Sequence, residues 1–322
     1  MHVVALKDYD GKWIESVIDL GLEIKKNPTK FENTLSHKTL AMIFQKTSTR
    51  TRLSFETGMT KLGGHAIYVD WRTTQLAMLR TEVRDSQEAK LLAMGGVQDE
   101  AKVISRYVDA IMVRPLKNAT VMEMTKTSRV PVINGLCEKY HPCQALADMM
   151  TVKEKFNKTK DIKITYLGIA NNVSNSLSLA AVRTGANFTL CTPERDPNSL
   201  DEEQLKWLCA QPNYHEESNL EKAVSGADIL YTDTWVNMEF FSDPKFAQEK
   251  ERREKALLPY QLNKKTLDIA GSQAHSMHDM PAHIDYEIDE YGLRGPKSLV
   301  FDQAENRMWA QMALLIKLLG EK

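Results

Sequence analysis

Short runs of β-prone apolar residues alternate with helix-length amphipathic segments along most of this chain of 322 residues. Strands that alternate with helices indicate βαβ units, and such units form parallel sheets flanked by helices. The pattern predicts strands at residues 40–44, 66–71, 109–113, 130–134, 162–168, 187–191, 227–235, 266–271 and 298–302. It predicts helices at residues 50–62, 99–107, 118–127, 143–156, 173–184, 200–210 and 304–319. The sequence therefore predicts an α/β fold.

The length of the chain exceeds what one small core needs, so two domains are expected. The long helix predicted at 143–156 would join two halves, because the strand and helix pattern restarts after it. Each half then has its own central parallel sheet flanked by helices. The charge-rich stretch at 245–260 is interpreted as a solvated surface helix or loop.

The composition excludes several classes of protein. The 42 basic and 43 acidic residues nearly cancel, which argues against a nucleic-acid-binding protein. The four cysteines form no Cys-x-x-Cys pair, so a disulfide scaffold or a zinc ribbon is not expected. The first residues lack a secretory pattern, and no apolar run approaches the roughly 18 residues of a membrane span. We therefore expect a soluble, cytoplasmic protein.

Ligands of parallel sheets bind beyond the carboxyl ends of the strands. The residues that follow each predicted strand are therefore the candidates for a functional site. They are rich in polar and charged side chains, namely those of Ser48–Arg52, Arg114, His141, Gln144, Asn171, Asn172, Asp233, His278 and Asp279, together with Arg307 in the last helix.

The segment Ser48-Thr49-Arg50-Thr51-Arg52 joins a predicted strand to a predicted helix. A helix N-terminus exposes unpaired N–H groups and a partial positive charge, so it suits a phosphate. The hydroxyls add donors, and Arg50 adds a planar fork for phosphate oxygens. A hydroxyl helix cap with surface arginines would explain the segment taken alone. Five polar residues in one turn favour the phosphate site, and Arg52, which points away from Arg50, is assigned a structural role.

Other ligands fit the motifs less well. The chain has no G-x-x-x-x-G-K-[ST] and no G-x-G-x-x-G after a strand, so nucleotide and dinucleotide sites are disfavoured. Cys137, His141 and Cys143 could be considered as metal ligands, but their spacing fits no common zinc pattern. His141 could also be a helix cap or a core residue.

Five motifs, STRTR, HPCQ, NNVSNS, DTWVNM and FDQAENR, occur in this order and resemble the carbamoyltransferases of the aspartate/ornithine type, most of all the ornithine branch. The resemblance runs nearly end to end. It implies reversible transfer of a carbamoyl group from carbamoyl phosphate to the δ-amine of L-ornithine, giving L-citrulline and phosphate, without metal or organic cofactor. It also implies a homotrimer with active sites shared between subunits. The implied domains are 1–140, completed by a C-terminal helix at 303–322 that packs back on it, and 141–302.

The resemblance implies a role for each matching residue on the carbamoyl phosphate side. The phosphate is held by the 48–51 turn, the carbamoyl group is held and polarised by three side chains after two strands, and the last helix completes the anion pocket. A glutamine of a neighbouring subunit reaches the phosphate. The set implied is Ser48, Thr49, Arg50, Thr51, Gln75, Arg114, His141, Gln144, Met280 and Arg307.

The ornithine side is implied in the same way. Asn172 and Asp233 would bind the α-carboxylate and the α-ammonium, and Asn237 and Met238 lie on a loop that would close over the amino acid. Catalysis is assigned to four residues, Arg50, Arg114, His141 and Asp279.

The chain departs from the family pattern at three places. His278-Asp279-Met280-Pro281 replaces the usual His-Cys-Leu-Pro, and Asn237-Met238-Glu239 replaces Ser-Met-Gly. The segment 76–98, interpreted as a loop that meets the neighbouring subunit, is longer than the loop expected there. Asp279 could accept a proton from the attacking amine. Alternatively it could turn toward Arg307 or His278 and only hold its loop.

Three functions remain open at this point. The first is ornithine carbamoyltransfer, the second is transfer to putrescine or an N-acylated ornithine, and the third is a weakly active paralogue with a regulatory role. A carboxylate at Asp233 favours a free α-ammonium, and therefore ornithine.

Overall fold

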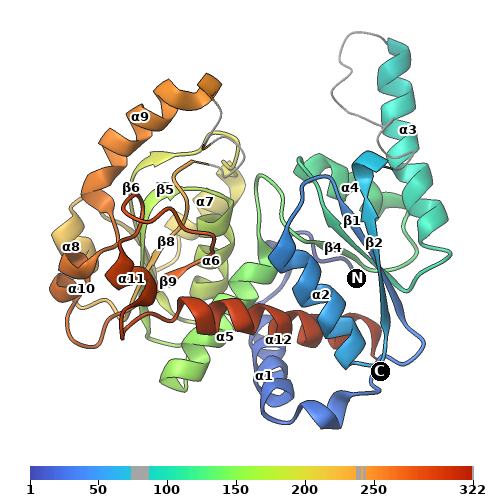
Figure 1. The fold of residues 1–322 in the computed structure, drawn as a ribbon, viewed down its shortest axis with the longest axis horizontal. Coiled ribbons are helices and arrows are strands. Elements are labelled where there is room, and N and C mark those ends of the chain that lie inside the picture. Colours follow the sequence, from blue (N-terminus) through green and yellow to red (C-terminus); the bar gives the residue numbers. More distant parts are fainter. Residues whose placement is uncertain (74–86, 237–240, 242–243, 321–322) are drawn as a thin grey trace. The chain divides into compact units, whose positions relative to one another are not determined.

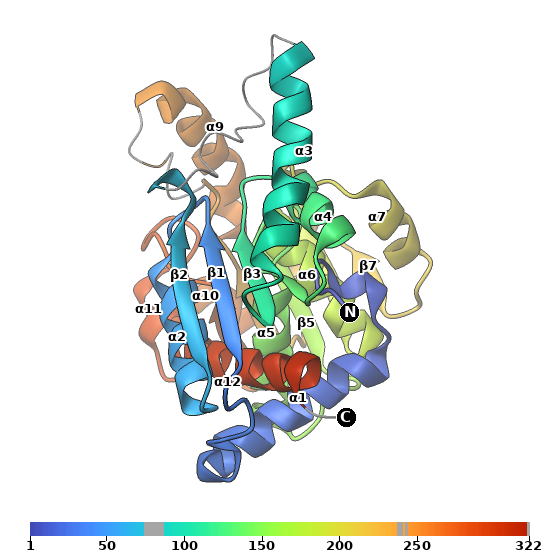
Figure 2. The same ribbon diagram turned by 90° about the vertical axis from the view of Figure 1, so that its right-hand side faces the viewer.

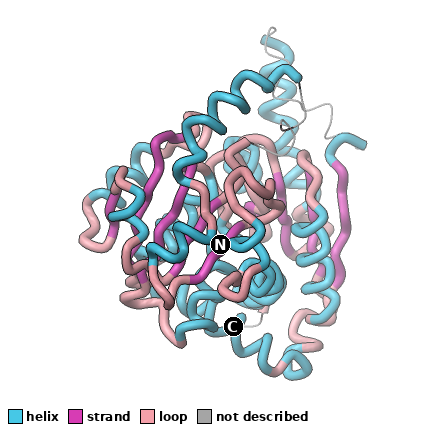
Figure 3. Tube along the Cα trace, turned by 60° about the vertical axis from the view of Figure 1, so that its left-hand side comes forward, coloured by secondary structure: helices cyan, strands magenta, loops and turns pink. Residues whose placement is uncertain are grey.

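A computed structural model describes residues 1–73, 87–236, 241 and 244–320, and for residues 87–95 it describes the backbone only. The chain forms two compact units. Unit 1 comprises Met1–Asp8, Ser16–Cys143 and Arg307–Lys322, and unit 2 comprises Tyr9–Glu15 and Gln144–Asn306. In each unit the strands lie between helices (Figure 3).

Unit 1 is built on a four-stranded parallel sheet in the order β2-β1-β3-β4. The central strands are almost wholly buried, as expected for a parallel sheet with helices on both faces. In the register of β1 with its two neighbours, Phe44 lies opposite both Asp70 and Arg114, so these strands end at one level. The strands are β1 (Thr39–Phe44), β2 (His65–Asp70), β3 (Ala110–Arg114) and β4 (Val132–Asn134).

Helices cover both faces of this sheet (Figure 2). One core cluster joins Ile43 and Val113 of the sheet to Ala101 of α3 and Val121 of α4. On α2, a Cβ placed at Gly58 would lie 3.0 Å from Met312 Cγ of α12, so these two helices pack closely. The helices of unit 1 are α2 (Thr49–Lys61), α3 (Gln87–Ile104) and α4 (Asn118–Thr127), with the larger parts of α1 (Gly11–Lys26) and α12 (Val300–Leu319).

Unit 2 has a five-stranded parallel sheet in the order β7-β6-β5-β8-β9 (Figure 1). Its strands are β5 (Lys163–Ala170), β6 (Asn187–Arg195), β7 (Tyr214–Glu216), β8 (Ile229–Thr232) and β9 (His275–His278). Its helices are α5 (Pro142–Phe156), which begins in unit 1, α6 (Asn172–Arg183), α7 (Glu202–Cys209), α8 (Leu220–Val224), α9 (Ala247–Leu257), α10 (Lys264–Ala270) and α11 (Glu290–Arg294). Short 3₁₀ helices lie at Leu6–Asp8, Pro28–Phe31, Trp71–Thr73, Pro244–Phe246 and Leu258–Tyr260.

The predicted fold class is confirmed. Each unit has a central parallel sheet flanked by helices, and the C-terminal helix packs on α2 of the first unit through Gly58 and Met312. Within the described ranges, no helix combines the length and the apolar character that crossing a bilayer requires.

Four predicted elements are wrong in part or entirely. Residues 266–270 fall in helix α10, which Gly271 caps, because Asn263 and Thr266 form a reciprocal capping box, and the strand follows as β9. Residues 298–302 open helix α12 from Val300, and Ser298 forms only an isolated bridge with Ser276. A short apolar run does not distinguish a strand from the first turn of a helix. Helix α3 begins at Gln87, so 87–98 is not a loop, and β8 ends at Thr232.

Candidate active site

The hydroxyl of Thr51 is the meeting point of three distant segments in unit 1. Ser48 caps helix α2 by accepting a hydrogen bond from the Thr51 N–H, and its own hydroxyl donates to Thr51 Oγ1 at 3.1 Å. Arg114 Nη1 and Arg307 Nη2 each donate to the same oxygen at 3.1 Å. Thr51 and both guanidiniums are buried. The end of β3, the start of α2 and the middle of α12 therefore converge on one atom.

His141 lies among the arginines of this cluster. Its side chain is buried, and burial followed by the charges of Arg307, Arg114 and Arg50 lowers its pKa well below the usual value. The imidazole is consequently neutral at physiological pH. It can donate one N–H to a carbonyl oxygen without adding a charge to the site.

Arg52 differs from its neighbour Arg50 in the way the sequence predicts. Its Nε lies 3.1 Å from Glu56 Oε2, and its guanidinium lies 4.0 Å from the centre of the Tyr68 ring. Thr49 is exposed as the first residue of α2. Arg52 thus makes its contacts on α2 and Tyr68, whereas the charge of Arg50 helps to lower the pKa of His141.

A buried carboxylate organises the start of helix α5 in unit 2. Asp148 Oδ1 accepts hydrogen bonds from Gln144 Nε2 at 2.8 Å and Gln303 Nε2 at 2.6 Å, and Oδ2 accepts from the Tyr231 hydroxyl at 3.2 Å. Gln303 Oε1 in turn accepts from the backbone N–H of His278 at 2.9 Å. One network therefore fixes Gln144 and the strand that leads to Asp279.

The orientation of Gln144 follows from this network. Because its amide nitrogen donates to Asp148, its oxygen Oε1 is the atom left to accept a hydrogen bond, and that oxygen accepts none from the described residues. The oxygen suits an N–H donor such as a carbamoyl NH₂. Sequence reasoning identified Gln144 but missed Asp148, although their spacing of four residues on a helix places them side by side.

Asp233 follows strand β8 and is buried beside the cap of helix α6. Asn171 donates from Nδ2 to Asp233 Oδ2 at 2.7 Å, while Asn171 Oδ1 accepts the N–H groups of Val173 and Ser174. Burial raises the pKa of Asp233. Asn171 is therefore the side chain that holds Asp233, and Asn172 is the first residue of α6. The Asn-x-x-Ser capping box was the sequence signal for this arrangement.

The turn that carries Asp279 is held by its neighbours. His278 Nδ1 accepts the Met280 N–H at 2.7 Å, and His278 Nε2 lies 3.3 Å from Glu287 Oε1. Burial alone would raise the pKa of Glu287, but the nearby imidazoles of His278 and His283, together with the His283 N–H that donates to it, lower it to about 2. The Met280 side chain packs against the core of unit 2, and the side chain of Asp279 is buried.

Three carboxylates give the surroundings of Asp233 an acidic character. The rings of Tyr166 and Tyr231 stack with centroids 5.6 Å apart, and burial raises the pKa of both hydroxyls. The charges of Asp148, Asp233 and Asp279 raise both values further, so all three carboxylates lie near this pair of rings. In their ionised form, three carboxylates in this arrangement would favour a cationic ligand.

Metal binding finds no support in the described residues. Among them, no three His, Cys, Asp or Glu side chains are grouped so as to hold an ion. Burial raises the pKa of Cys137 to about 11 and that of Cys143 to about 12, and a protonated thiol is a poor ligand. Three predicted residues, Gln75, Asn237 and Met238, lie outside the described residues.

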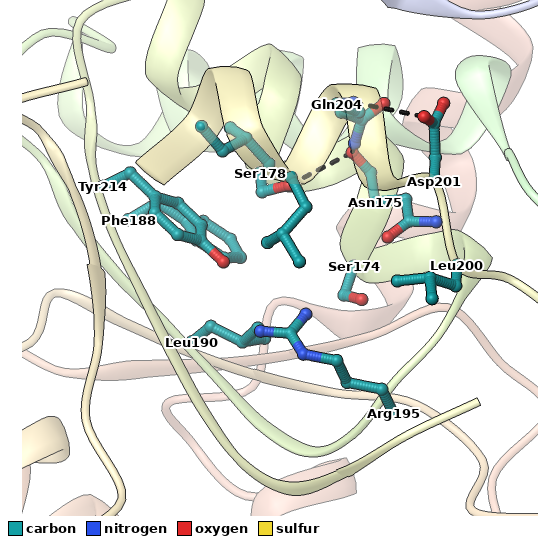
Figure 4. A pocket seen from close by; sticks show the side chains of 12 residues that line it. Ser174, Asn175, Ser178, Phe188, Leu190, Arg195, Leu200, Asp201, Gln204 and Tyr214 are labelled. Atoms are coloured by element: carbon teal, nitrogen blue, oxygen red, sulfur yellow. Dashed lines mark hydrogen bonds between the residues drawn. The ribbon is translucent and has the colours of Figure 1, made fainter. Parts of the chain in front are cut away.

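A small cavity elsewhere in unit 2 lies between α6, α7, β6 and β7 (Figure 4). Phe188 and Tyr214 stack on one of its walls, and Arg195 reaches into it. Its volume of about 20 Å³ holds roughly one water molecule. An amino acid does not fit there, so the cavity is not a substrate site.

Comparisons with known proteins agree with the division of the chain. Residues 1–154 match the carbamoyl-phosphate-binding domain of the aspartate/ornithine carbamoyltransferases, and residues 160–318 match the Asp/Orn-binding domain. An ornithine carbamoyltransferase of Archaeoglobus fulgidus is 39% identical, covering 100% of this chain and 98% of the relative. One of Bacillus anthracis is 39% identical, covering 98% of this chain and 93% of the relative.

Solved structures of ornithine carbamoyltransferases also match this chain over nearly its whole length. The ornithine carbamoyltransferase of Pyrococcus furiosus is 38% identical with a TM-score of 0.85, covering 100% of this chain and 98% of that chain. That of Thermus thermophilus is 31% identical with a TM-score of 0.82, covering 99% and 98%. The fold and the motifs define a carbamoyl-group transferase. The chain belongs to the aspartate/ornithine carbamoyltransferase family, as its motifs predict.

Proposed function

We propose that the protein transfers the carbamoyl group of carbamoyl phosphate to the δ-amine of L-ornithine, giving L-citrulline and phosphate. The observation that carries this proposal is the convergence of Arg114 and Arg307 on the Thr51 hydroxyl at the N-terminus of α2. A helix N-terminus with arginine side chains directed to it is suited to a phosphate dianion. The names of the relatives favour ornithine as the acceptor.

Carbamoyl phosphate would bind mainly on unit 1. The hydroxyls and N–H groups of the 48–51 turn, with Arg50, take the phosphate, and Arg114, His141 and Gln144 take the carbamoyl group. The full set proposed is Ser48, Thr49, Arg50, Thr51, Arg114, His141, Gln144, Met280 and Arg307, with Gln75 supplied by a neighbouring subunit.

Transfer then proceeds by addition and elimination. The δ-amine attacks the carbamoyl carbon, the carbon–nitrogen bond forms, and the carbonyl oxygen becomes an oxyanion. The neutral imidazole of His141 and the charged guanidinium of Arg114 stabilise that oxyanion. Gln144 Oε1 accepts a hydrogen bond from an N–H of the carbamoyl group. The carbon–oxygen bond to phosphate breaks, and the arginines stabilise the leaving anion. The amine loses one proton during the step.

The acidic site of unit 2 would bind ornithine. Asp233 pairs with the α-ammonium, Asn172 binds the α-carboxylate, and Asn237 and Met238 contribute the loop. Asp279 is proposed to receive the proton of the δ-amine, which is mostly protonated at neutral pH because an alkyl amine has a pKa of about 10.4. His278 and Glu287 hold the turn in which Asp279 lies.

Alternative acceptors are putrescine, an N-acylated ornithine and L-aspartate. Putrescine and N-acylornithine offer no free α-ammonium to Asp233, and the second carboxylate of aspartate would be repelled by the acidic surroundings. The test is citrulline-type product formation from carbamoyl phosphate with each acceptor in parallel. Ornithine should be preferred by at least about a hundredfold, the scale on which a site rejects a ligand that leaves a buried polar group unpaired. Preference for another acceptor contradicts the assignment, and inactivity with every acceptor favours a regulatory paralogue.

The proposal also covers the oligomeric state, the domain boundaries and the cellular location of the protein. We propose a homotrimer with shared sites, as the family resemblance implies. The proposed domains are 1–140 with 303–322, and 141–302. The cytoplasm is the proposed location, since free cysteines persist in a reducing compartment.

A further inference from the structure

Helix α9 carries the charge-rich stretch that sequence analysis assigned to a solvated surface. Its Arg252 donates two hydrogen bonds to Glu194 at the end of β6, at 2.9 and 2.7 Å, and two to Glu249 at 2.7 Å. Arg253 Nε donates to Glu249 Oε1 at 2.9 Å. These ion pairs lower the pKa of Glu249 to about 2, with Arg252 as the main cause. The helix is thus tied to the sheet of unit 2, beside β6 in Figure 1.

The same helix contacts both flanks of a segment that follows Asp233. Arg253 Nη1 donates to the backbone oxygen of Trp235 at 2.8 Å, and Leu257 packs with the fully buried Trp235 in one cluster. Lys250 Nζ lies 3.7 Å from the centre of the Phe241 ring. Trp235 and Phe241 flank Asn237 and Met238 in the sequence.

Phe241 extends these contacts to the turn that carries Asp279. Its ring stacks on His283 with centroids 3.6 Å apart and planes 10° apart. His283 Nδ1 lies 3.5 Å from Glu287 Oε2, and Glu287 faces His278. A continuous series of contacts therefore runs from α9 to the residue before Asp279.

We propose that α9 is a positioning element for the acceptor amino acid, with Arg253 as its main positioning residue. The helix fixes Trp235, two residues after Asp233, and it fixes Phe241 against His283. This inference rests on the proposed function, because it assigns acceptor binding to Asp233 and Asp279. It assigns no role to α9 in holding carbamoyl phosphate.

Exposure decides which contact matters. The Arg252 side chain is 51% exposed, and exposed ion pairs contribute little. The Arg253 side chain is 17% exposed and donates to a main-chain oxygen beside a buried ring, so its loss leaves that oxygen without its charged donor. Glu251 and Lys255 form an exposed pair on the same helix, which supplies a matched control.

The test compares Arg253→Gln with Glu251→Gln. In Arg253→Gln the KM for ornithine should rise about tenfold, the scale of one charge-assisted hydrogen bond, while the KM for carbamoyl phosphate stays within about twofold. Hydrogen exchange should quicken in peptides that contain Trp235 and Phe241 and stay unchanged in unit 1. Glu251→Gln should match the wild type in both measurements.

A second variant, Lys250→Met, keeps the side-chain length and removes the cation over Phe241. Its KM for ornithine should rise by less than in Arg253→Gln, and its KM for carbamoyl phosphate should again stay nearly unchanged. This variant tests the inference if Arg253→Gln does not fold. Equal effects in Arg253→Gln, Lys250→Met and Glu251→Gln, or no effect in any, would overturn the inference. Failure of the wild type to form citrulline would overturn the proposed function instead, since the exchange comparison requires no activity.

Discussion

The two units share one architecture and differ in the charge they present. In unit 1 Arg50, Arg114 and Arg307 surround a neutral His141. In unit 2 Asp148, Asp233 and Asp279 lie near one pair of stacked tyrosine rings. Parallel α/β sheets place loops at the carboxyl ends of their strands in both cases, so the fold supplies position and the loop residues supply chemistry. The difference matches an anionic carbamoyl donor and a cationic acceptor.

The two sites also differ in how they are held. In unit 1 three segments converge on a single hydroxyl, that of Thr51. In unit 2 the carboxylates are held by connecting side chains, with Asn171 on Asp233 and Gln144 and Gln303 on Asp148. A buried carboxylate must be paired or hydrogen-bonded to remain in place, which explains the larger network.

The largest effect is expected from Arg50→Ala. If Arg50 grips the phosphate, citrulline formation should fall by about 10²–10³, the scale of one lost transition-state donor. Arg52→Ala is the matched control on the same turn, because Arg52 pairs with Glu56 outside the cluster, and it should retain activity within about twofold. Near-wild-type rates in Arg50→Ala would contradict the assignment of the phosphate site to this turn.

Asp279→Asn tests the acidic side of the comparison with a change of nearly equal shape. If Asp279 receives the proton of the amine, kcat should fall by about a hundredfold and the acidic limb of its pH profile should disappear. The measurement is kcat against pH for the wild type and the variant. An unchanged rate and profile would mean that Asp279 only holds its loop.

Asp148→Asn should lower the rate by less than Asp279→Asn, and it should affect the use of both substrates. The variant keeps the shape but weakens the hydrogen bonds to Gln144 and Gln303, so kcat should fall about tenfold. Tyr231→Phe removes the 3.2 Å contact to Asp148 and the 2.9 Å hydrogen bond from Gln303, but it leaves both amides on the carboxylate, so it should cost about threefold or less. Steady-state kinetics with both substrates varied gives these values, and a larger loss in Tyr231→Phe than in Asp148→Asn would contradict the network.

The smallest effect concerns stability and the neutral state of His141. The pKa of His141 is lowered in the folded chain, so below a pH of about 6.5 the unfolded chain binds a proton that the folded chain does not. Stability should therefore fall as the pH is lowered from 7.5 to 5.5. In His141→Gln this fall should be smaller by about 1 kcal/mol, measured by urea unfolding at both pH values. An identical fall in the variant would mean that His141 is protonated in the folded chain.

The sequence placed the 48–51 turn and Arg114 together because both follow predicted strands, whereas Arg307, in helix α12, was implied only by the family resemblance. Phe44 and Arg114 are adjacent in the register of β1 and β3, so a correct strand assignment was enough to bring the 48–51 turn near Arg114. The fold was predictable for the same reason, except where an apolar run such as 298–302 served as the first turn of a helix.

The rest depends on contacts that sequence patterns do not encode. Asp148 meets Gln303 across 155 positions of the chain, and no local spacing indicates that pair. Asn171 and Asn172 are adjacent, and only the cap geometry shows which of them contacts Asp233. Helix α9 has the composition of a solvated surface, yet Arg253 is mostly buried.

The most direct test of opposite charge in the two units removes one charged side chain from each and puts an uncharged amide in its place. Arg114→Gln and Asp233→Asn are compared with the wild type by measuring the KM of both substrates. Arg114→Gln should raise the KM for carbamoyl phosphate by about tenfold or more and leave that for ornithine within about twofold, and Asp233→Asn should do the reverse. If both variants raise both KM values equally, or if Asp233→Asn leaves ornithine binding unchanged, the division of the two substrates between an arginine site and a carboxylate site is contradicted.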